Sequence, residues 1–354
     1  MKQTKFFGLN MSALFIIVLG GLLLTACGTS NSTSSSGGSG GGSGSSGGGS
    51  SSCASPPKLS KTTGLKVGFS QNENTGPWRL AETKSMQDAA KAQGAQLIFT
   101  DAQSSASKQI SDVDSLIAQK VDVIVLAPLT SEPLAKAVQD AKAACIPVVL
   151  IDRDVDHKLA SPNKDYVTFI GSNFVQQGKL AADWLIKNTG GKAKIIELQG
   201  TTGASAATDR KTGFDNEIKT APGMSILASQ DADFNRDKGR QTMQTLLQAH
   251  PDVTAVYAHN DEMAIGAIAA LKAAGKKPGK DVTVVSIDGE RDGMNAIING
   301  ELGTSVQSSP FFGPITFQTI SQYASGNKIP DWVVVQDLQY TKDNVQQYIA
   351  KNAY

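Results

Sequence analysis

The chain has 354 residues, and 33 lysines and arginines against 32 aspartates and glutamates give a formal net charge of +1. This balance gives no electrostatic reason to expect DNA, RNA or an anionic surface as a partner. With 40% apolar residues and 35 glycines, the composition is that of a globular protein and excludes a disordered or fibrous chain. The length suits two domains of about 120–150 residues each. Three cysteines are too few for a disulfide scaffold.

The first residues have the pattern of a targeting segment. Lys2 and Lys5 precede fourteen mostly apolar residues, 11–24, which is shorter than the roughly 20 residues of a membrane-spanning helix. The run ends in Leu-Thr-Ala-Cys at 24–27, which resembles a bacterial lipoprotein signal. We therefore predict a signal peptide at 1–26 and a lipid on Cys27. A short anchor helix with an incidental cysteine is the less favoured alternative. Loss of both lysines leaves 31 basic against 32 acidic residues, a charge of −1.

Residues 28–52 consist almost entirely of serine and glycine. Such a segment buries too little apolar surface to order itself, so we predict a tether over 27–63. About 28 residues of such coil reach roughly 30 Å. Cys53 is interpreted as an incidental residue of this tether. Cys145, just before an apolar run, is interpreted as a small core residue.

Beyond Gly64, short β-branched runs alternate with amphipathic segments. The predicted strands are 66–70, 96–100, 121–127, 146–151, 167–170, 194–198, 253–258 and 282–287, and predicted helices include 108–119, 132–144 and 177–188. Several runs are apolar on both faces, as parallel strands covered by helices require. The alternation predicts a doubly wound α/β fold with two sheets, although eight strands also suit a (β/α)8 barrel.

Polar and aromatic residues gather where the predicted strands end, which is where ligands lie in open α/β sheets. The candidates are Trp78, Arg79, Glu82, Asp152, Arg153, Arg210, Phe234, Asn260, Asp288 and Gln307. Simpler structural interpretations also exist: Trp78 could belong to the core, and two further residues near strand ends, Asp261 and Asn173, are better explained as helix N-caps.

Together these side chains suit a sugar. A sugar presents an apolar C–H face, which suits aromatic rings, and hydroxyls that both donate and accept hydrogen bonds. Carboxylates accept from hydroxyls, and guanidinium and amide groups donate to their remaining lone pairs. An even mixture of acids and bases satisfies a neutral polar ligand better than one sign of charge does.

From residue 66 to the end, the chain resembles the periplasmic sugar-binding proteins of ABC importers, in the ribose/galactose-binding group with the LacI-like fold. The matching segments are 67–71, 122–128, 147–153, 200–210, 232–236, 258–266 and 286–289. Segments 76–83 (GPWRLAET) and 258–261 (AHND) are most similar to the galactofuranose-binding branch. Gln307 departs from that branch, where a glutamate is expected, and matches the ribose-type proteins.

The resemblance implies two Rossmann-like lobes of the type I periplasmic-binding-protein fold. The expected lobes are 64–168 with 308–335 and 169–307 with 336–354, joined by a three-stranded hinge near 168–171, 307–310 and 333–337. It implies stacking by Trp78 and Phe234 and hydrogen bonding by the polar candidates. The implied function is lipid-anchored capture of galactofuranose or a related furanose for an ABC permease and its ATPase. A sensory lipoprotein that binds ribose, arabinose or galactopyranose is the alternative.

Rival functions have weaker support. The histidines at 157, 250 and 259 sit in no G-x-S-x-G or Cys-His context, so we predict no catalytic residue. We expect His259 to support Asn260 or to pack near the strand end. G-x-G-x-x-G occurs only in the serine/glycine tether, and no His/Cys/carboxylate spacing matches a metal site. We therefore expect no cofactor, no metal and no nucleic acid, and an extracytoplasmic monomer held at the membrane by Cys27.

Overall fold

The computed structural model describes residues 53–354. The predicted signal peptide, the lipidated Cys27 and most of the predicted tether lie outside this range. Among the described residues, no helix is both long enough and apolar enough to cross a membrane.

The first of two lobes is built on a six-stranded sheet in which every neighbouring pair is parallel, in the order β11-β5-β4-β3-β1-β2. Its strands are β1 Lys66–Gln71, β2 Gln96–Asp101, β3 Val123–Leu126, β4 Val148–Ile151, β5 Thr168–Ser172 and β11 Trp332–Val335. Its helices are α1 Gly76–Ala92, α2 Ala106–Ala118, α3 Ser131–Ala143 and α9 Gly313–Ala324.

Alternate residues of each strand in this sheet enter different cores. Val123 and Val125 pack in the cluster that contains side chains of α1 and α9. Ile124 and Leu126 pack with α2 and α3 on the opposite face. This period of two explains why β3 is apolar along its whole length, as a parallel strand covered on both faces must be.

The second lobe has a six-stranded sheet in the order β12-β10-β9-β8-β6-β7, in which only the β10–β12 pair is antiparallel. Its strands are β6 Lys192–Gln199, β7 Gly223–Asp231, β8 Ala255–Ala258, β9 Thr283–Asp288, β10 Thr304–Gln307 and β12 Gln339–Thr341. Its helices are α4 Phe174–Asn188, α5 Ser205–Ile218, α6 Arg236–Ala249, α7 Asp261–Ala273, α8 Arg291–Ile298 and α10 Val345–Asn352.

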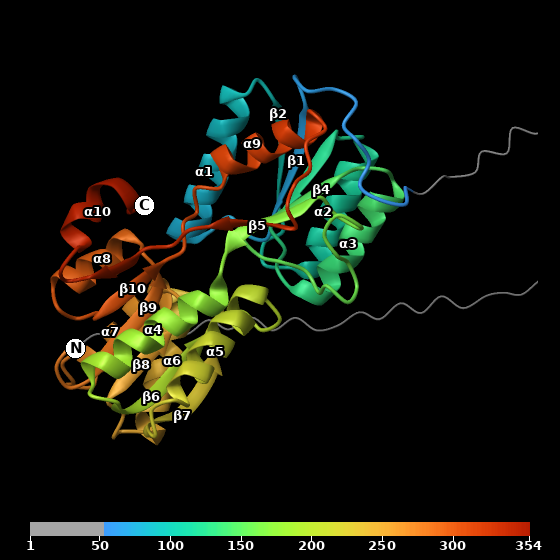
Figure 1. Ribbon diagram of the computed structural model, residues 1–354. Helices are drawn as coiled ribbons and strands as arrows, with labels where there is room; N and C mark the ends of the chain where they lie inside the picture. The colour runs from blue at the N-terminus through green and yellow to red at the C-terminus, as the bar shows by residue number, and fades with distance from the viewer. Residues whose placement is uncertain (1–52) are drawn as a thin grey trace, which may run out of the picture. The chain divides into compact units, whose positions relative to one another are not determined.

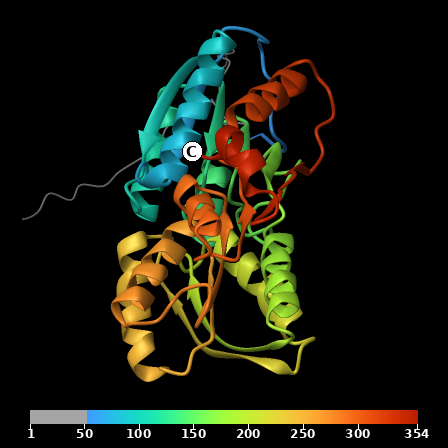
Figure 2. The same ribbon diagram turned by 90° about the vertical axis from the view of Figure 1, so that its left-hand side faces the viewer.

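Three segments connect the lobes, as the predicted hinge requires (Figures 1 and 2). They are the step from β5 to α4, the step from β10 to α9, and the step from β11 to β12. Two separate sheets rule out the barrel that periodicity had left open. β5 stays in the first sheet as far as Ser172, so the chain leaves the first lobe slightly later than the predicted boundary at 168.

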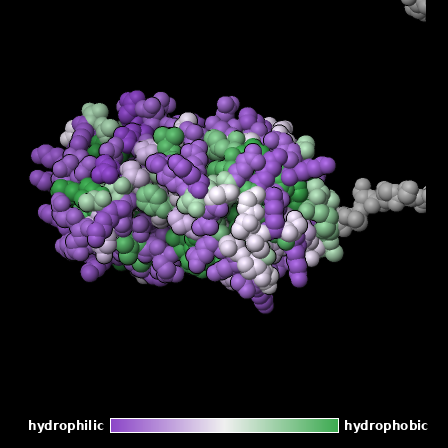
Figure 3. Space-filling model, turned by 90° about the horizontal axis from the view of Figure 1, so that it is seen from above, coloured by the Kyte–Doolittle hydropathy of each residue, from purple (hydrophilic) through white to green (hydrophobic). Residues whose placement is uncertain are grey.

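Large hydrophobic side chains are seldom exposed among the described residues. Seen from above the first lobe, the surface is mainly hydrophilic, with hydrophobic side chains in small, separate groups (Figure 3). Exposed examples are Leu80, Leu159, Val175, Phe311, Trp332, Val334 and Leu338. Several belong to the segments near the connections between the lobes.

The prediction for Cys53 and Cys145 is wrong, because the two residues form a disulfide. The segment that follows Cys53 also lies on the first lobe. Tyr323 donates from its hydroxyl to the carbonyls of Pro56 and Pro57, both at 2.9 Å, and Lys61 forms an ion pair with Asp122 at 2.8 Å. The tether's last residues, 53–63, are therefore bonded to the folded body, although their composition alone predicts a free linker.

We expect replacement of Cys53 and Cys145 by serine together to lower the free energy of unfolding by about 2–4 kcal/mol, because the bond closes a long loop in the unfolded chain. Urea unfolding with and without a reductant measures this. Reductant should destabilise the wild-type protein and leave the double variant unchanged. Equal stability of the two proteins under oxidising conditions would contradict the assignment.

Candidate functional site

A cavity lies between the lobes, at the carboxyl ends of strands from both sheets. Asp152 follows β4, Asn260 follows β8 and Asp288 ends β9. Ligands of open α/β sheets bind at this edge. Fifteen residues line the cavity: Glu73, Thr75, Gly76, Pro77, Trp78, Arg79, Asp152, Arg153, Ala206, Arg210, Phe234, Asn260, Glu262, Asp288 and Glu290.

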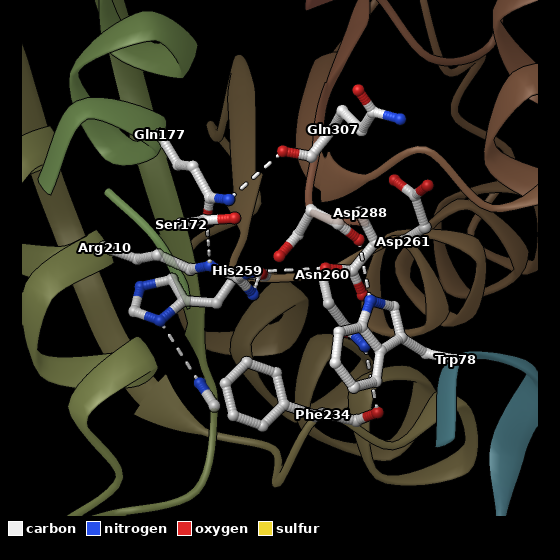
Figure 4. Close-up of polar contacts among 12 residues, drawn as sticks. Trp78, Ser172, Gln177, Arg210, Phe234, His259, Asn260, Asp261, Asp288 and Gln307 are labelled. Carbon is white, nitrogen blue, oxygen red and sulfur yellow. Dashed lines mark hydrogen bonds and ion pairs between the residues drawn. The ribbon is translucent and has the colours of Figure 1, made fainter. Parts of the chain in front are cut away.

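The structure brings most of the residues predicted from the sequence to this cavity. Eight of the ten line it: Trp78, Arg79, Asp152, Arg153, Arg210, Phe234, Asn260 and Asp288. Glu82 is fully buried behind Arg79 instead. Gln307 lies at the connection between the lobes, where its side-chain oxygen accepts from the Leu338 amide at 3.2 Å. Figure 4 shows the Gln307 side chain pointing away from Phe234 and Asn260.

The first-lobe wall is organised around Arg79. Its guanidinium pairs with Glu82 and with Asp152, both at 2.7 Å, and lies 4.4 Å from the centre of the Trp78 ring. Gln71 donates a further hydrogen bond to Glu82 at 2.6 Å. Burial raises the pKa of Glu82 to about 7, although Arg79 opposes the rise. Arg79 is therefore held rigidly between two carboxyl groups.

Trp78 links the two parts of the cavity wall. Its indole nitrogen donates to the Ser308 carbonyl at 2.8 Å, in the segment that connects β10 to α9 (Figure 4). The ring also packs against Phe312, with the centroids 6.2 Å apart. Trp78 thus belongs to the first-lobe core and lines the cavity at once.

The second-lobe wall is organised around Arg210, which comes from α5. Its Nε donates to Gln177 at 2.9 Å, its Nη1 to the His259 carbonyl at 2.6 Å and its Nη2 to Asp288 at 3.2 Å. α4 approaches α5 closely here, since a Cβ on Gly178 would lie 2.1 Å from the Arg210 carbonyl oxygen. Burial raises the pKa of Asp288 to about 8 despite the attraction of Arg210.

His259 supports this wall from behind, as the sequence had suggested. The ring is fully buried, contacts Glu197 at 3.0 Å through Nε2 and accepts from the Gly200 amide at 3.3 Å through Nδ1. Burial lowers the pKa of His259, which favours the neutral imidazole. The histidine orients the backbone that Arg210 binds and does not line the cavity.

Arg153 reaches across from the first lobe to an aromatic ring of the second. Its guanidinium lies 5.2 Å from the centre of Phe234, and that of Arg210 lies 5.7 Å from the same ring. Burial and the neighbouring charge of Arg79 lower the pKa of Arg153 to about 10. Arg153 donates one bond to the Leu129 carbonyl at 3.0 Å, while its Nε makes no hydrogen bond.

Three cavity residues that are not glycine have a positive φ. The values are 60° at Asp152, 56° at Phe234 and 126° at Asp288. Such conformations cost free energy and cluster at functional sites, where the surrounding structure enforces them. Phe234 also needs Gly200, because a Cβ there would lie 1.9 Å from the ring.

Asn260, and not Asp261, is the N-cap of α7, so the prediction for Asp261 is wrong. Asn260 accepts from the Met263 amide at 3.0 Å and donates to the Phe234 carbonyl at 3.2 Å. Asp261 is buried and holds the β9–α8 turn, accepting from the amides of Gly289 at 2.9 Å and Glu290 at 2.8 Å. Asn173 caps α4 through the Gln176 amide, as predicted.

Sequence reasoning missed three acidic residues of the cavity, Glu73, Glu262 and Glu290. Glu73 accepts from Ser104 at 2.8 Å, and Glu262 pairs with Arg236. With them, five carboxyl groups and three guanidinium groups line the cavity. None of the three follows a predicted strand directly. A search for polar residues where predicted strands end could therefore not select them.

Comparison with known proteins agrees with this geometry. The family model described as a periplasmic binding protein domain matches residues 67–328. The Galactofuranose-binding protein YtfQ of Escherichia coli is 39% identical over 292 residues, which covers 81% of this chain and 91% of that protein.

Two solved structures are also similar. A galactofuranose binding protein has a TM-score of 0.78 and 38% identity, covering 81% of this chain and 98% of that one. The binding protein of the arabinose ABC transporter from Shewanella sp. ANA-3, bound to L-arabinofuranose, has a TM-score of 0.77 and 38% identity, covering 81% and 95%. Proteins of this kind bind solutes and are not enzymes. With a family model that spans most of its length and two lobes that enclose a polar cavity, the chain belongs to the periplasmic binding protein family.

Proposed function

We propose that this protein captures a monosaccharide between its two lobes and delivers it to an ABC-type sugar importer. The observation that carries the proposal is the make-up of the cavity wall, where two aromatic rings stand among guanidinium and carboxyl groups. Trp78 and Phe234 offer flat apolar surfaces to the C–H face of a sugar. Arg153 and Asp288 supply a donor and an acceptor for its hydroxyls.

A neutral ligand suits the cavity better than an anionic one. The three lining arginines are already engaged by carboxyl groups or by carbonyl oxygens. A phosphorylated sugar would bring further negative charge to a wall that holds five carboxyl groups. Its charge would have to be buried beside these carboxyl groups, which is costly.

Among monosaccharides we propose galactofuranose or a related furanose. The names of the similar proteins support this choice, since they bind galactofuranose and L-arabinofuranose. Gln307 does not favour ribose over galactofuranose, because its side chain is bonded at the connection between the lobes and does not line the cavity. Transport and sensing of the same sugar would use the same cavity, and the family favours transport.

We further propose that the two lobes, 64–172 with 308–335 and 173–307 with 336–354 once the first boundary is moved to the end of β5, close around the sugar at the three connections. Capture by closure explains why the cavity takes residues from both lobes. The surfaces that closure brings together would be those that the permease recognises.

We propose an extracytoplasmic monomer held at the membrane by a lipid on Cys27. The disulfide between Cys53 and Cys145 supports this location, because such bonds persist in oxidising compartments. The small, separate hydrophobic groups in Figure 3 fit a protein that needs no second copy to cover them.

Thermal unfolding against galactose, L-arabinose, ribose, glucose and ribose 5-phosphate tests the ligand class. A ligand at 100 times its Kd adds about 2.7 kcal/mol of stability. We expect at least one neutral furanose-forming sugar to raise the melting temperature by several degrees and the phosphate to have no effect. No shift with any neutral sugar would contradict the proposed function.

Arg153→Ala should weaken sugar binding by about 100-fold or more, because hydrogen bonds to a buried charged group contribute the most. The fold should remain, since the Arg153 side chain donates one hydrogen bond to the backbone, to the Leu129 carbonyl, and the residue lies just after the end of β4. Calorimetric titration measures the affinity. Arg240→Ala on α6, whose side chain is 44% exposed, is the matched control and should bind like wild type. Affinity of Arg153→Ala within a few-fold of wild type would exclude Arg153 from the site.

Cys27→Ser should release the protein from the membrane, because the thiol is the proposed attachment point of the lipid. Fractionation of cells that express the wild-type and variant proteins measures this. Cys53→Ser should stay in the membrane fraction. Continued membrane attachment of Cys27→Ser would contradict the anchor.

A further inference from the structure

Glu290 is a buried carboxyl group that the proposed site does not yet use. It lies in the turn between β9 and α8, is 1% exposed and lines the cavity. Its backbone amide donates to Asp261 at 2.8 Å, but neither side-chain oxygen accepts from a protein donor, and the side chain lies within hydrogen-bond reach of the Glu262 carboxyl group. The turn is thus held by its backbone, and the Glu290 side chain is not needed for that.

The other acidic residues that line the cavity all have partners. Asp152 pairs with Arg79, and Asp288 pairs with Arg210. Glu262 pairs with Arg236, and Glu73 accepts from Thr75 and Ser104. Among the described lining residues, Glu290 is the one carboxyl group that neither pairs with a cation nor accepts a hydrogen bond from a protein donor, and its side chain meets another carboxyl group, that of Glu262. A buried polar group without a partner costs free energy, so its presence needs an explanation.

The groups that face Glu290 are acidic. Asp288 approaches from β9, and Asp261 and Glu262 approach from α7. Tyr354, beyond α10, reaches the same region and donates to the Asp288 carbonyl at 3.3 Å. The arginines that contact these carboxyl groups, Arg210 and Arg236, are already paired with Asp288 and Glu262, and Arg291, the next residue in the chain, donates to the Ala353 carbonyl at 3.1 Å. Burial, followed by these neighbouring carboxylates, raises the pKa of Glu290 well above its ordinary value.

We propose that Glu290 is a further ligand-contacting residue, which meets a hydroxyl group of the bound sugar as a protonated carboxyl group. In that form it offers one O–H donor and one carbonyl acceptor, which matches a hydroxyl that also donates and accepts. The inference rests on the proposed function. It deepens that function by identifying a contact on the second-lobe wall that favours neutral, hydroxyl-bearing ligands.

The proposal makes sugar binding dependent on pH. If the complex holds the proton on Glu290, the affinity is complete below the pKa of that group in the free protein and falls as the pH rises through it. Asp288 also titrates, so the wild-type profile alone does not isolate Glu290. Glu290→Gln isolates it, because the amide keeps a donor and an acceptor at every pH.

Calorimetric titration between about pH 6 and pH 9 tests the proposal with a sugar that binds wild type. We expect Glu290→Gln to bind within about threefold of wild type at the acidic end. As the pH rises, the affinity of this variant should fall less than that of wild type. Glu290→Leu should bind at least about tenfold more weakly at the acidic end, where the contact is intact in wild type. Glu132→Gln, an exposed residue at the start of α3, is the matched control and should keep the wild-type profile.

The stability of the sugar-free variants separates a ligand contact from a structural role. An acidic group whose pKa is higher in the folded protein lowers stability above its unfolded pKa. Glu290→Gln and Glu290→Leu should therefore melt at higher temperature than wild type, with a larger difference at pH 8 than at pH 5. A structural role predicts lower melting temperatures instead.

Four results would overturn the proposal. Wild-type affinity in Glu290→Leu would exclude the contact, and a joint loss of stability and affinity would make Glu290 structural. A Glu290→Gln protein that binds as weakly as Glu290→Leu would show that the contact needs a carboxylate. A wild-type protein that binds no sugar would overturn the proposed function, and this inference with it.

Discussion

The pairing of buried charges is the constraint on which the rest of the site depends. Arg79, Arg153 and Arg210 are at most 6% exposed, and an ion removed from water is tolerated only when paired and hydrogen-bonded. Arg79 meets this requirement with two carboxyl groups and Arg210 with Asp288 and two oxygen acceptors. These pairs fix the donors and acceptors before a ligand arrives, so less ordering free energy is lost on binding.

The fold provides what these pairs require. In each lobe, strands covered on both faces end at the cavity, and the residues after them turn their side chains between the lobes. This placement gives Asp152 and Asp288 positive φ values, and a backbone conformation of that kind raises the free energy of the folded state locally. Because each wall is rigid within its own lobe and the lobes are joined by three segments, motion at the connections can open the cavity without disturbing the pairs.

Strand ends were predictable from the sequence, because apolar runs and the polar residues that follow them are local signals. Contacts between distant segments were not. β7 was missed because its burial alternates weakly at the edge of the sheet, and Cys53 was interpreted as part of a linker because its partner lies 92 residues away. Glu290 follows a glycine and opens a helix like many surface glutamates, so only the packing of α7 against its turn shows that it is buried.

We propose that one cavity, built from both lobes, holds a neutral sugar. A crystal structure of the protein with a sugar selected by thermal unfolding tests it most directly. We expect a sugar ring between Trp78 and Phe234, with hydroxyls within hydrogen-bond distance of Arg153 and Asp288. A sugar bound elsewhere, or in this cavity without contact to residues of both lobes, would contradict it.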